Sequence, residues 1–244
     1  MKQLLFVILA MVFAFRVSAQ ASKTDTVAVM ILDHMSNVIG DLTSCSFTLK
    51  TQTDVVDPDA GLISQFAVNE VYFDGPDKML IQANGDNGHK GLWYNGKLLV
   101  YYSFDENNYA VIDAPSTSLQ TIDSIHNNFG IDYPAADFFY PSFTDDLLNM
   151  SNQVIYDGLK MVEGKECFHI VARGRNSSVQ LWIANDALYL PVKMIIISNT
   201  TGQTLQYEAT FTSWQLNPVL PAAIFDFLPP PSARQISILP KNSN

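Results

Sequence analysis

Two periodicities of apolar side chains divide the sequence into helical and extended regions. Between Asp25 and Gly40 the apolar positions recur every three or four residues behind capping side chains, which predicts one amphipathic helix. From Cys45 onward apolar and polar positions alternate instead, beginning with an expected strand over residues 44–51. The chain is therefore expected to open with a helix and continue as extended structure.

A long series of alternating segments follows, which is typical of antiparallel strands. Asn95-Gly96 between two of them is a strong signal for a two-residue type I′ hairpin turn. The clearest alternation is TLQYEATFT at 204–212, which predicts one buried face. The further expected strands are Phe66–Phe73, Lys78–Gln82, Gly91–Tyr94, Lys97–Ser103, Tyr109–Ile112, Val154–Tyr156, Glu166–Ala172, Val179–Ala184, Val192–Ser198 and Leu205–Trp214.

Helical spacing returns in the middle of the chain. Ser118 is placed to cap a helix that ends at Gly130, and Pro134 and Pro141 suit the first positions of two shorter helical pieces. These pieces are rich in phenylalanine and leucine. An insertion this apolar has to pack on another apolar surface.

These elements predict a mainly β (α+β) fold, with roughly ten antiparallel strands in one strongly curved sheet that forms an incomplete β-barrel. The N-terminal helix and the helical insertion are expected on its concave side as a lid. The run from Met194 to Ile197 offers apolar side chains to both faces, so one face should look into the concavity and the other pack on a neighbouring loop or edge. A fully packed core explains the same pattern, because periodicity does not distinguish a filled interior from a hollow one.

The first residues have the pattern of an export signal. Lys2 precedes the apolar run LLFVILAMVFAF, and Ser18 and Ala19 are small enough for a signal peptidase. We expect cleavage of residues 1–19 and a single domain over 20–244, located in the periplasm, or secreted if the source is not Gram-negative. The run is too short to span a bilayer and no cysteine follows it for a lipid anchor, so an integral membrane protein is not expected.

The net charge and the two cysteines narrow the classes of partner and the thiol chemistry that are expected. The formal net charge of -10 argues against nucleic acid as a partner. Cys45 and Cys167 either form a disulfide in an oxidising compartment or lie buried and apart. Neither cysteine belongs to a CxxC motif, so thiol exchange is not expected.

The usual signatures of catalysis are missing from the sequence. It has no GxSxG, no HExxH, no phosphate-binding glycine loop and no dinucleotide fingerprint, and none of its 4 histidines has a second ligand at metal spacing. Cys167 and His169 share a strand face, where packing with a hydrogen bond is more frequent than an activated thiolate. We therefore expect a protein that is not an enzyme and has neither a cofactor nor a metal site.

Several segments together carry a family resemblance. In order they are WYNGKLLVYYSFDENNYAVIDAP, IDYPAADFF, EGKECFHIVA, VQLWIANDALYLPVKMIII, LQYEATFTSW and FDFLPPPSA. The sequence resembles a family of predicted periplasmic proteins of unknown function, related to the outer-membrane lipoprotein carriers of the LolA-like superfamily. The resemblance covers nearly all of the chain after the signal. It implies an incomplete β-barrel whose helices form a lid over an apolar cavity.

The function that the resemblance implies is non-enzymatic binding of a lipid, an acyl chain or a lipoprotein. The carriers move their lid with an arginine on an early strand, whereas the first strand here holds only Lys50, so their mechanism is not carried over. The same concave surface also suits an interaction or sensor protein that recognises a peptide or an envelope protein. The expected cavity lining is Phe47, Phe66, Trp93, Phe138, Phe139, Leu181, Ile183, Met194, Ile196, Leu205, Tyr207 and Phe211.

Overall fold

The strands of the protein form one open, curved sheet. The computed structural model describes residues 24–131, 133–200 and 202–241, so the expected export signal at 1–19 lies outside the described residues. The strands are β1 (Ser44–Asp57), β2 (Gly61–Asp74), β3 (Lys78–Gly85), β4 (Gly88–Tyr94), β5 (Leu98–Ser103), β6 (Asn108–Asp113), β7 (Gln153–Val162), β8 (Lys165–Arg173), β9 (Ser177–Ala184), β10 (Pro191–Thr200), β11 (Gln203–Leu216) and β12 (Arg234–Gln235).

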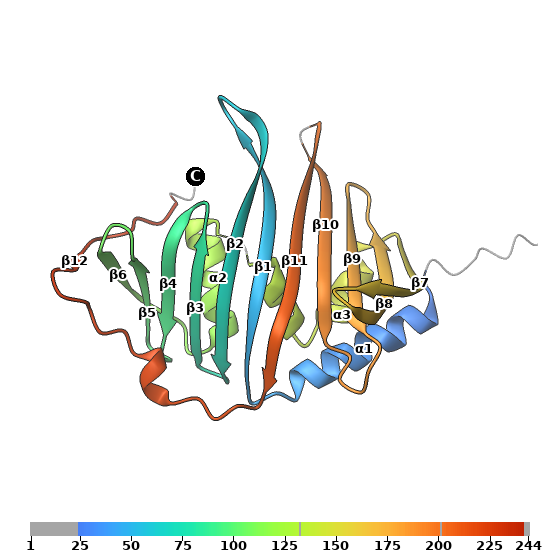
Figure 1. The fold of residues 1–244 in the computed structure, drawn as a ribbon, viewed down its shortest axis with the longest axis horizontal. Helices are drawn as coiled ribbons and strands as arrows, with labels where there is room; N and C mark the ends of the chain where they lie inside the picture. The colour runs from blue at the N-terminus through green and yellow to red at the C-terminus, as the bar shows by residue number, and fades with distance from the viewer. Residues whose placement is uncertain (1–23, 132, 201, 242–244) are drawn as a thin grey trace, which may run out of the picture.

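The order of the strands joins the two halves of the chain in the middle of the sheet. The 12 strands run in the order β12-β6-β5-β4-β3-β2-β1-β11-β10-β9-β8-β7 (Figure 1). Strands β1 and β11 pair antiparallel at the centre, and the short β12 pairs in parallel with β6 at one edge. The predicted mainly β fold with a strongly curved antiparallel sheet is confirmed.

Helices cover one face of this sheet (Figure 1). They are α1 (Thr26–Gly40), α2 (Ser118–Phe129), the 3-10 helix η1 (Pro134–Phe139) and α3 (Phe143–Met150), while a second 3-10 helix, η2 (Ala222–Phe225), lies in the C-terminal segment. Asp25 caps α1 by accepting the backbone N–H of Val27 at 2.8 Å. Thr117, and not the expected Ser118, caps α2, and Gly130 ends it with a φ of 64°.

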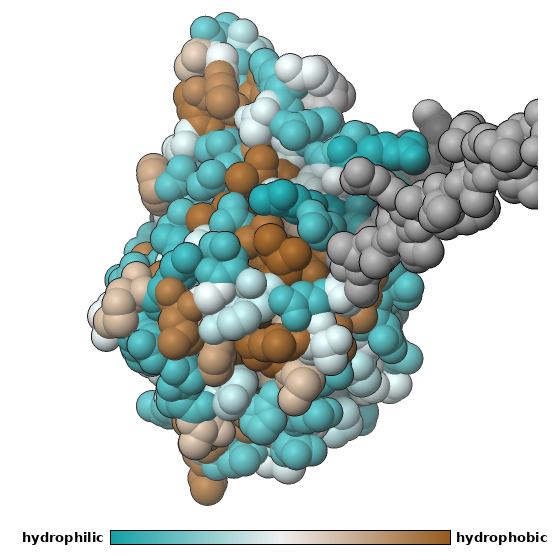
Figure 2. Space-filling model, turned by 90° about the vertical axis from the view of Figure 1, so that its right-hand side faces the viewer, coloured by the Kyte–Doolittle hydropathy of each residue, from teal (hydrophilic) through white to brown (hydrophobic). Residues whose placement is uncertain are grey.

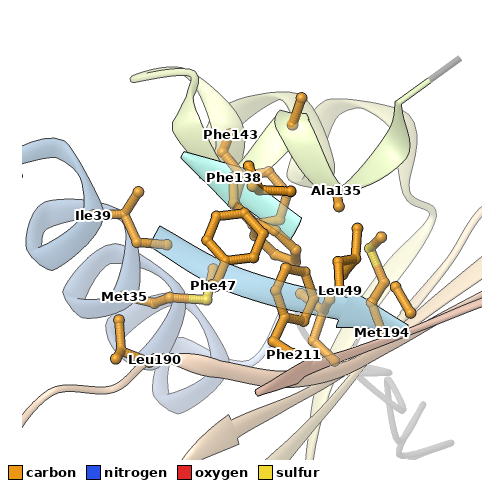
Figure 3. Close-up of a cluster of buried hydrophobic side chains, with 14 of the residues drawn as sticks. Met35, Ile39, Phe47, Leu49, Ala135, Phe138, Phe143, Leu190, Met194 and Phe211 are labelled. Carbon is orange, nitrogen blue, oxygen red and sulfur yellow. The ribbon is translucent and has the colours of Figure 1, made fainter. Parts of the chain in front are cut away.

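The helices and the concave face of the sheet share one apolar core (Figure 3). Phe138 of η1 lies 4.9 Å from Phe143 of α3 and 5.5 Å from Phe211 of β11, measured between ring centroids. In the same core Met35 of α1 and Phe47 of β1 are buried. The helical insertion predicted from the sequence therefore packs on the sheet, as its apolar composition requires.

The run in β10 that is apolar on both faces is divided by the sheet. Met194 and Ile196 contribute to the core on the concave side. Ile195 and Ile197 alternate with them and are half-buried on the convex side. This strand therefore supplies one wall of the core.

The C-terminal segment covers a different part of the convex face. Phe227 packs against Trp93, Tyr102 and Tyr109, with ring centroids 5.0, 5.3 and 5.5 Å away. Beyond it, β12 adds to the edge of β6 (Figure 1). Tyr94 of β4 is thus buried on the concave side by the core, and Tyr102 of β5 is buried on the convex side by this segment.

Strands β1 and β2 extend well beyond the expected segments. Their pairing continues as far as Asp57 opposite Gly61, and the hairpin rises above the rest of the sheet (Figure 1). The cross-strand pairs Val55–Ile63 and Val56–Leu62 support this extension with apolar contacts. We call residues 51–67 the arm.

The hairpin between β4 and β5 forms as predicted, but its turn differs. Of Asn95 and Gly96, only the glycine has a positive φ, of 90°, whereas a type I′ turn needs both. The Asn95 side chain instead accepts the backbone N–H groups of Lys97 and Leu98 at 3.3 and 3.2 Å. The expected type I′ turn is wrong because this side-chain bond holds a three-residue loop.

Candidate functional site

A cavity of about 180 Å³ lies between the concave face of the sheet and the segment that carries α2 and η1. The sheet contributes residues of β1, β2, β3 and β11, and the opposite wall comes from α2, η1 and the residue before η1. The lining residues are Phe47, Leu49, Thr51, Thr53, Asn69, Val71, Phe73, Ile81, Ile122, Tyr133, Ala135, Ala136, Phe139 and Tyr207.

Small and large side chains in η1 explain why the space is left open. Ala135 and Ala136 face the sheet at positions where larger residues would fill the cavity. Phe139 closes one end, with its ring 4.9 Å from Phe73 and 6.1 Å from Phe47. The cavity is therefore bounded by aromatic rings at this end.

The polar groups of the cavity carry no charge. Burial raises the pKa of the Tyr133 hydroxyl well above its usual range, and burial raises that of Tyr207 in the same way. Asn69 donates its amide N–H to the Leu49 carbonyl at 3.0 Å across the β1–β2 pair. A mostly apolar space with neutral polar groups favours an uncharged, apolar guest.

A second hollow, of about 360 Å³, continues from this cavity along the arm. The two share Thr51 and Thr53, so these threonines stand at the junction. Gly85 at the base of this hollow has no room for a side chain. It lies so close to β2 that a Cβ there would come within 2.2 Å of the Phe66 carbonyl oxygen. The hollow is lined by Thr51, Thr53, Val55, Gln65, Phe66, Ala67, Ala83, Gly85, Asn87, Gly88 and Lys90.

Comparison with known sequences assigns the chain to a family. Residues 28–239 match the family described as "Predicted periplasmic protein (DUF2092)". The chain belongs to this family. Its members are periplasmic by that description, which agrees with the localisation and the family predicted from the sequence. A search of curated proteins gave no match.

Several solved structures match this structure at low TM-scores and low sequence identity. An uncharacterised conserved protein from Thermus thermophilus has a TM-score of 0.49 at 12% identity, over 86% of this chain and 98% of that one. The lipoprotein LppX of Mycobacterium tuberculosis has a TM-score of 0.48 at 15% identity, over 81% and 99%. A LolA superfamily protein from Nitrosomonas europaea has a TM-score of 0.39 at 10% identity, over 82% and 97%. Similarity at this level carries no statement about function.

The structure divides the expected lining residues among three environments. Phe47, Phe139 and Tyr207 line the cavity. Trp93 lies on the convex face against Phe227, and Phe66 borders the second hollow with its side chain largely exposed. The others belong to the concave face or to the packed core: Phe138, Leu181, Ile183, Met194, Ile196, Leu205 and Phe211.

The sequence reasoning missed most of the wall around the cavity in this family member. Its apolar part includes Leu49 and Val71, which continue the alternation that was already recognised in their strands. Thr51, the last residue of the expected first strand, and Thr53, which lies beyond its expected end, continue the same phase. Extending that alternation would have identified the threonines. In contrast, no pattern in the sequence indicates that Ala135 and Ala136 lie against the sheet.

The two cysteines lie apart in separate clusters. Cys45 belongs to the main core, and Cys167 packs with Ala184 and Val192. Both thiols are free, so the alternative of a disulfide between them is not realised. Burial raises the pKa of the Cys45 thiol to about 12 and also raises that of Cys167, which disfavours the nucleophilic thiolate form of both.

His169 takes part in a hydrogen-bonded cluster on the convex face. Its Nδ1 lies 3.1 Å from an Asp157 carboxylate oxygen, its Nε2 lies 3.2 Å from the Gln180 amide oxygen, and its ring stacks on Trp182 at 4.5 Å. Cys167 instead donates to the Lys165 carbonyl at 3.6 Å. The imidazole and the thiol therefore have separate partners, as in ordinary packing.

Neither a metal cluster nor a spanning helix is found in the part of the chain that the structure describes. Its His, Cys, Asp and Glu side chains nowhere form a group of three that would hold a metal ion. No helix among residues 24–131, 133–200 and 202–241 is long and apolar enough to cross a membrane.

Proposed function

We propose that this protein is a non-enzymatic periplasmic binding protein that shields the acyl chain of a lipid or lipoprotein on its concave face. The observation that supports this proposal is the apolar cavity between the sheet and the α2–η1 segment, which continues into the hollow along the arm. An apolar concavity with a few uncharged polar groups is the usual form of a site for small apolar ligands.

The sizes of the two spaces suggest how such a ligand is held. An apolar cavity of roughly 150 Å³ accepts a benzene-sized molecule, so the inner cavity of about 180 Å³ accommodates the end of an acyl chain and not a whole lipid. The hollow of about 360 Å³ holds the next part of the chain. Each methylene removed from water contributes about 0.8 kcal/mol, so burying several of them supplies the affinity.

A plug at the junction of the two spaces tests the proposal. Thr51→Phe places a ring between the cavity and the hollow, and phenylalanine is well tolerated in strands. We expect about tenfold or greater weakening of binding for a fluorescent fatty acid, because the chain no longer reaches the inner cavity.

The control for this plug is the neighbouring Gln52→Phe. Gln52 alternates with Thr51 and so faces the convex side of the same strand. This variant should bind as the wild type does. A wild-type protein that stays empty in native mass spectrometry and does not bind the fluorescent fatty acid contradicts the proposal.

A second candidate function is recognition of an envelope protein. The convex side of the arm exposes apolar side chains, and apolar surface gathers near the top of the molecule in Figure 2, at the level of the arm. The exposed residues are Val56, Leu62 and Phe66, with Val68 directly after the arm. A protein retained by the wild type and lost with Leu62→Ser, at unchanged fatty-acid binding, would support this function, because Leu62 is exposed and lines neither space. Copurification of lipid alone would exclude it.

A further inference from the structure

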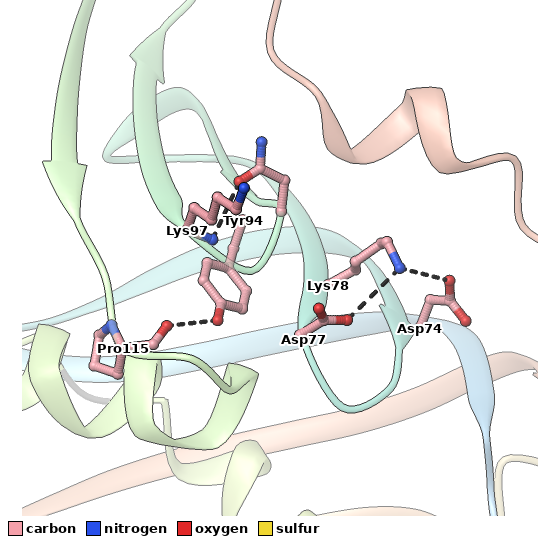
Figure 4. Close-up of polar contacts among 7 residues, drawn as sticks. Asp74, Asp77, Lys78, Tyr94, Lys97 and Pro115 are labelled. Carbon is pink, nitrogen blue, oxygen red and sulfur yellow. Dashed lines mark hydrogen bonds and ion pairs between the residues drawn. The ribbon is translucent and has the colours of Figure 1, made fainter.

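One lysine of the concave face lacks the carboxylate partner that comparable lysines have. The ammonium nitrogen of Lys78 lies 3.7 Å from a carboxylate oxygen of Asp74 and 3.6 Å from one of Asp77 (Figure 4). Lys193 forms an ion pair with Glu208. Lys90 is likewise half-buried, yet no carboxylate of the described residues lies within ion-pair distance of its ammonium group. A partly enclosed ammonium group that has no carboxylate within ion-pair distance is free to donate charge-assisted hydrogen bonds to another anion.

The strand register places Lys90 in the second hollow. Lys90 of β4 pairs with Ala83 of β3, and the small side chains of Ala83 and Ala67 lie on the floor between it and β1. Across that floor stand Thr51 and Thr53, at the junction with the inner cavity. A molecule whose tail enters the cavity at the threonines therefore has its other end near Lys90.

Lys90 is the one charged side chain among the described residues that line either space. Asn87 also lines the hollow and donates its amide N–H to the Gln65 side chain at 2.8 Å. Two carboxylates stand beside this wall without lining it, and each accepts a backbone N–H: Asp86 that of Phe66 at 2.8 Å, and Asp105, which like Lys90 borders Gly88, that of His89 at 2.7 Å. The hollow thus combines one cation with uncharged hydrogen-bonding groups.

From this geometry we infer that the ligand is an anionic amphiphile, with its acyl chain in the inner cavity and its anionic head group at Lys90. This inference rests on the proposed function and adds the chemical class of the head group. A carboxylate and a phosphodiester share the required chemistry, since each accepts charge-assisted hydrogen bonds from an ammonium group. The acyl chain supplies most of the affinity, and Lys90 selects the head group.

Three probes with the same chain test the inference: palmitate, palmitoyl-lysophosphatidylglycerol and the neutral hexadecanol. In the wild type, at least one of the two anionic probes should bind more tightly than hexadecanol. Lys90→Met should weaken the anionic probes by about tenfold, the effect expected for one partly exposed charge-assisted hydrogen bond, and leave hexadecanol unchanged. Whichever anionic probe loses more identifies the head group as a carboxylate or a phosphodiester.

The matched controls are Lys50→Met and Lys90→Arg. Lys50 is exposed on the convex side of β1, so its replacement changes the net charge equally without touching the hollow. Lys50→Met should behave as the wild type does, and Lys90→Arg should keep the preference for the anionic probes. If Lys90→Met does not fold, the salt dependence of the wild type decides, because added salt weakens an ion pair and not the burial of a chain.

The outcomes separate the two proposals. Equal binding of all three probes, or equal weakening of all three by Lys90→Met, overturns the inference about the head group and leaves the binding function standing. Failure of the wild type to bind any probe overturns the binding function itself. Salt-independent binding of the anionic probes to the wild type also overturns the inference.

Discussion

Phe138 and Phe139 are adjacent in η1 but have different surroundings, so replacing each by alanine tests the division between core and cavity. Phe138 is 2% exposed and contacts the rings of Phe143 and Phe211. Phe139 is half-buried and lines the cavity. The two variants remove the same atoms from the same helix, which makes each the control for the other.

The structure predicts that the two substitutions lower the free energy of unfolding by different amounts. Loss of a fully packed phenylalanine ring costs about 3–5 kcal/mol, so Phe138→Ala should lower the melting temperature by roughly 6–20 °C for a chain of this size. Phe139→Ala should cost about half as much, because part of its ring already borders empty space. Urea denaturation followed by circular dichroism measures both free energies of unfolding.

The effect on fatty-acid binding should be larger for Phe139→Ala, although this variant loses less stability. Phe139→Ala enlarges the cavity, so the preferred fatty acid should become longer, with about 0.8 kcal/mol gained for each further methylene buried. Phe138→Ala should leave the chain-length preference as it is, at a temperature where the variant is folded. Equal losses of stability together with unchanged chain-length preference in both variants would refute the assignment of Phe139 to the cavity wall.

Two further predictions concern polar contacts. Tyr94 is fully buried and donates its hydroxyl to the Pro115 carbonyl at 2.6 Å (Figure 4), so Tyr94→Phe should lower the free energy of unfolding by about 1 kcal/mol in urea denaturation, and an unchanged value would contradict a role for this bond. The hydrogen bond from His169, together with Lys160, lowers the pKa of Asp157. Ionised Asp157 therefore contributes its full stabilisation above the unfolded-state pKa of about 3.9, and this contribution is lost as the pH falls through the lower folded-state pKa. Asp157→Asn should therefore flatten the loss of stability on acidification, measured by urea denaturation at a series of acidic pH values, and an unchanged pH dependence would contradict this assignment.

The sequence determined the classes of structure because periodicity is a local property. The alternation that starts at Cys45 marks strands, and the apolar helical pieces after Pro115 must cover an apolar surface. The same alternation left the orientation of some strands open. In β2 and β4 both phases hold large apolar residues, so Phe66 and Trp93 were expected in the cavity although Ala67 and Tyr94 face the concave side.

Only the tertiary structure decided where empty space remains and what borders it. The cavity depends on Ala135 and Ala136 meeting the sheet, and the isolated ammonium group of Lys90 depends on the neighbouring order β1-β2-β3-β4, which brings it toward Thr51. The central pair of β1 and β11 likewise joins residues such as Cys45 and Leu216 that lie far apart in the chain. Periodicity specifies which side of an element is apolar, whereas the space between elements depends on how their side chains fit together, and that is a property of the assembled fold.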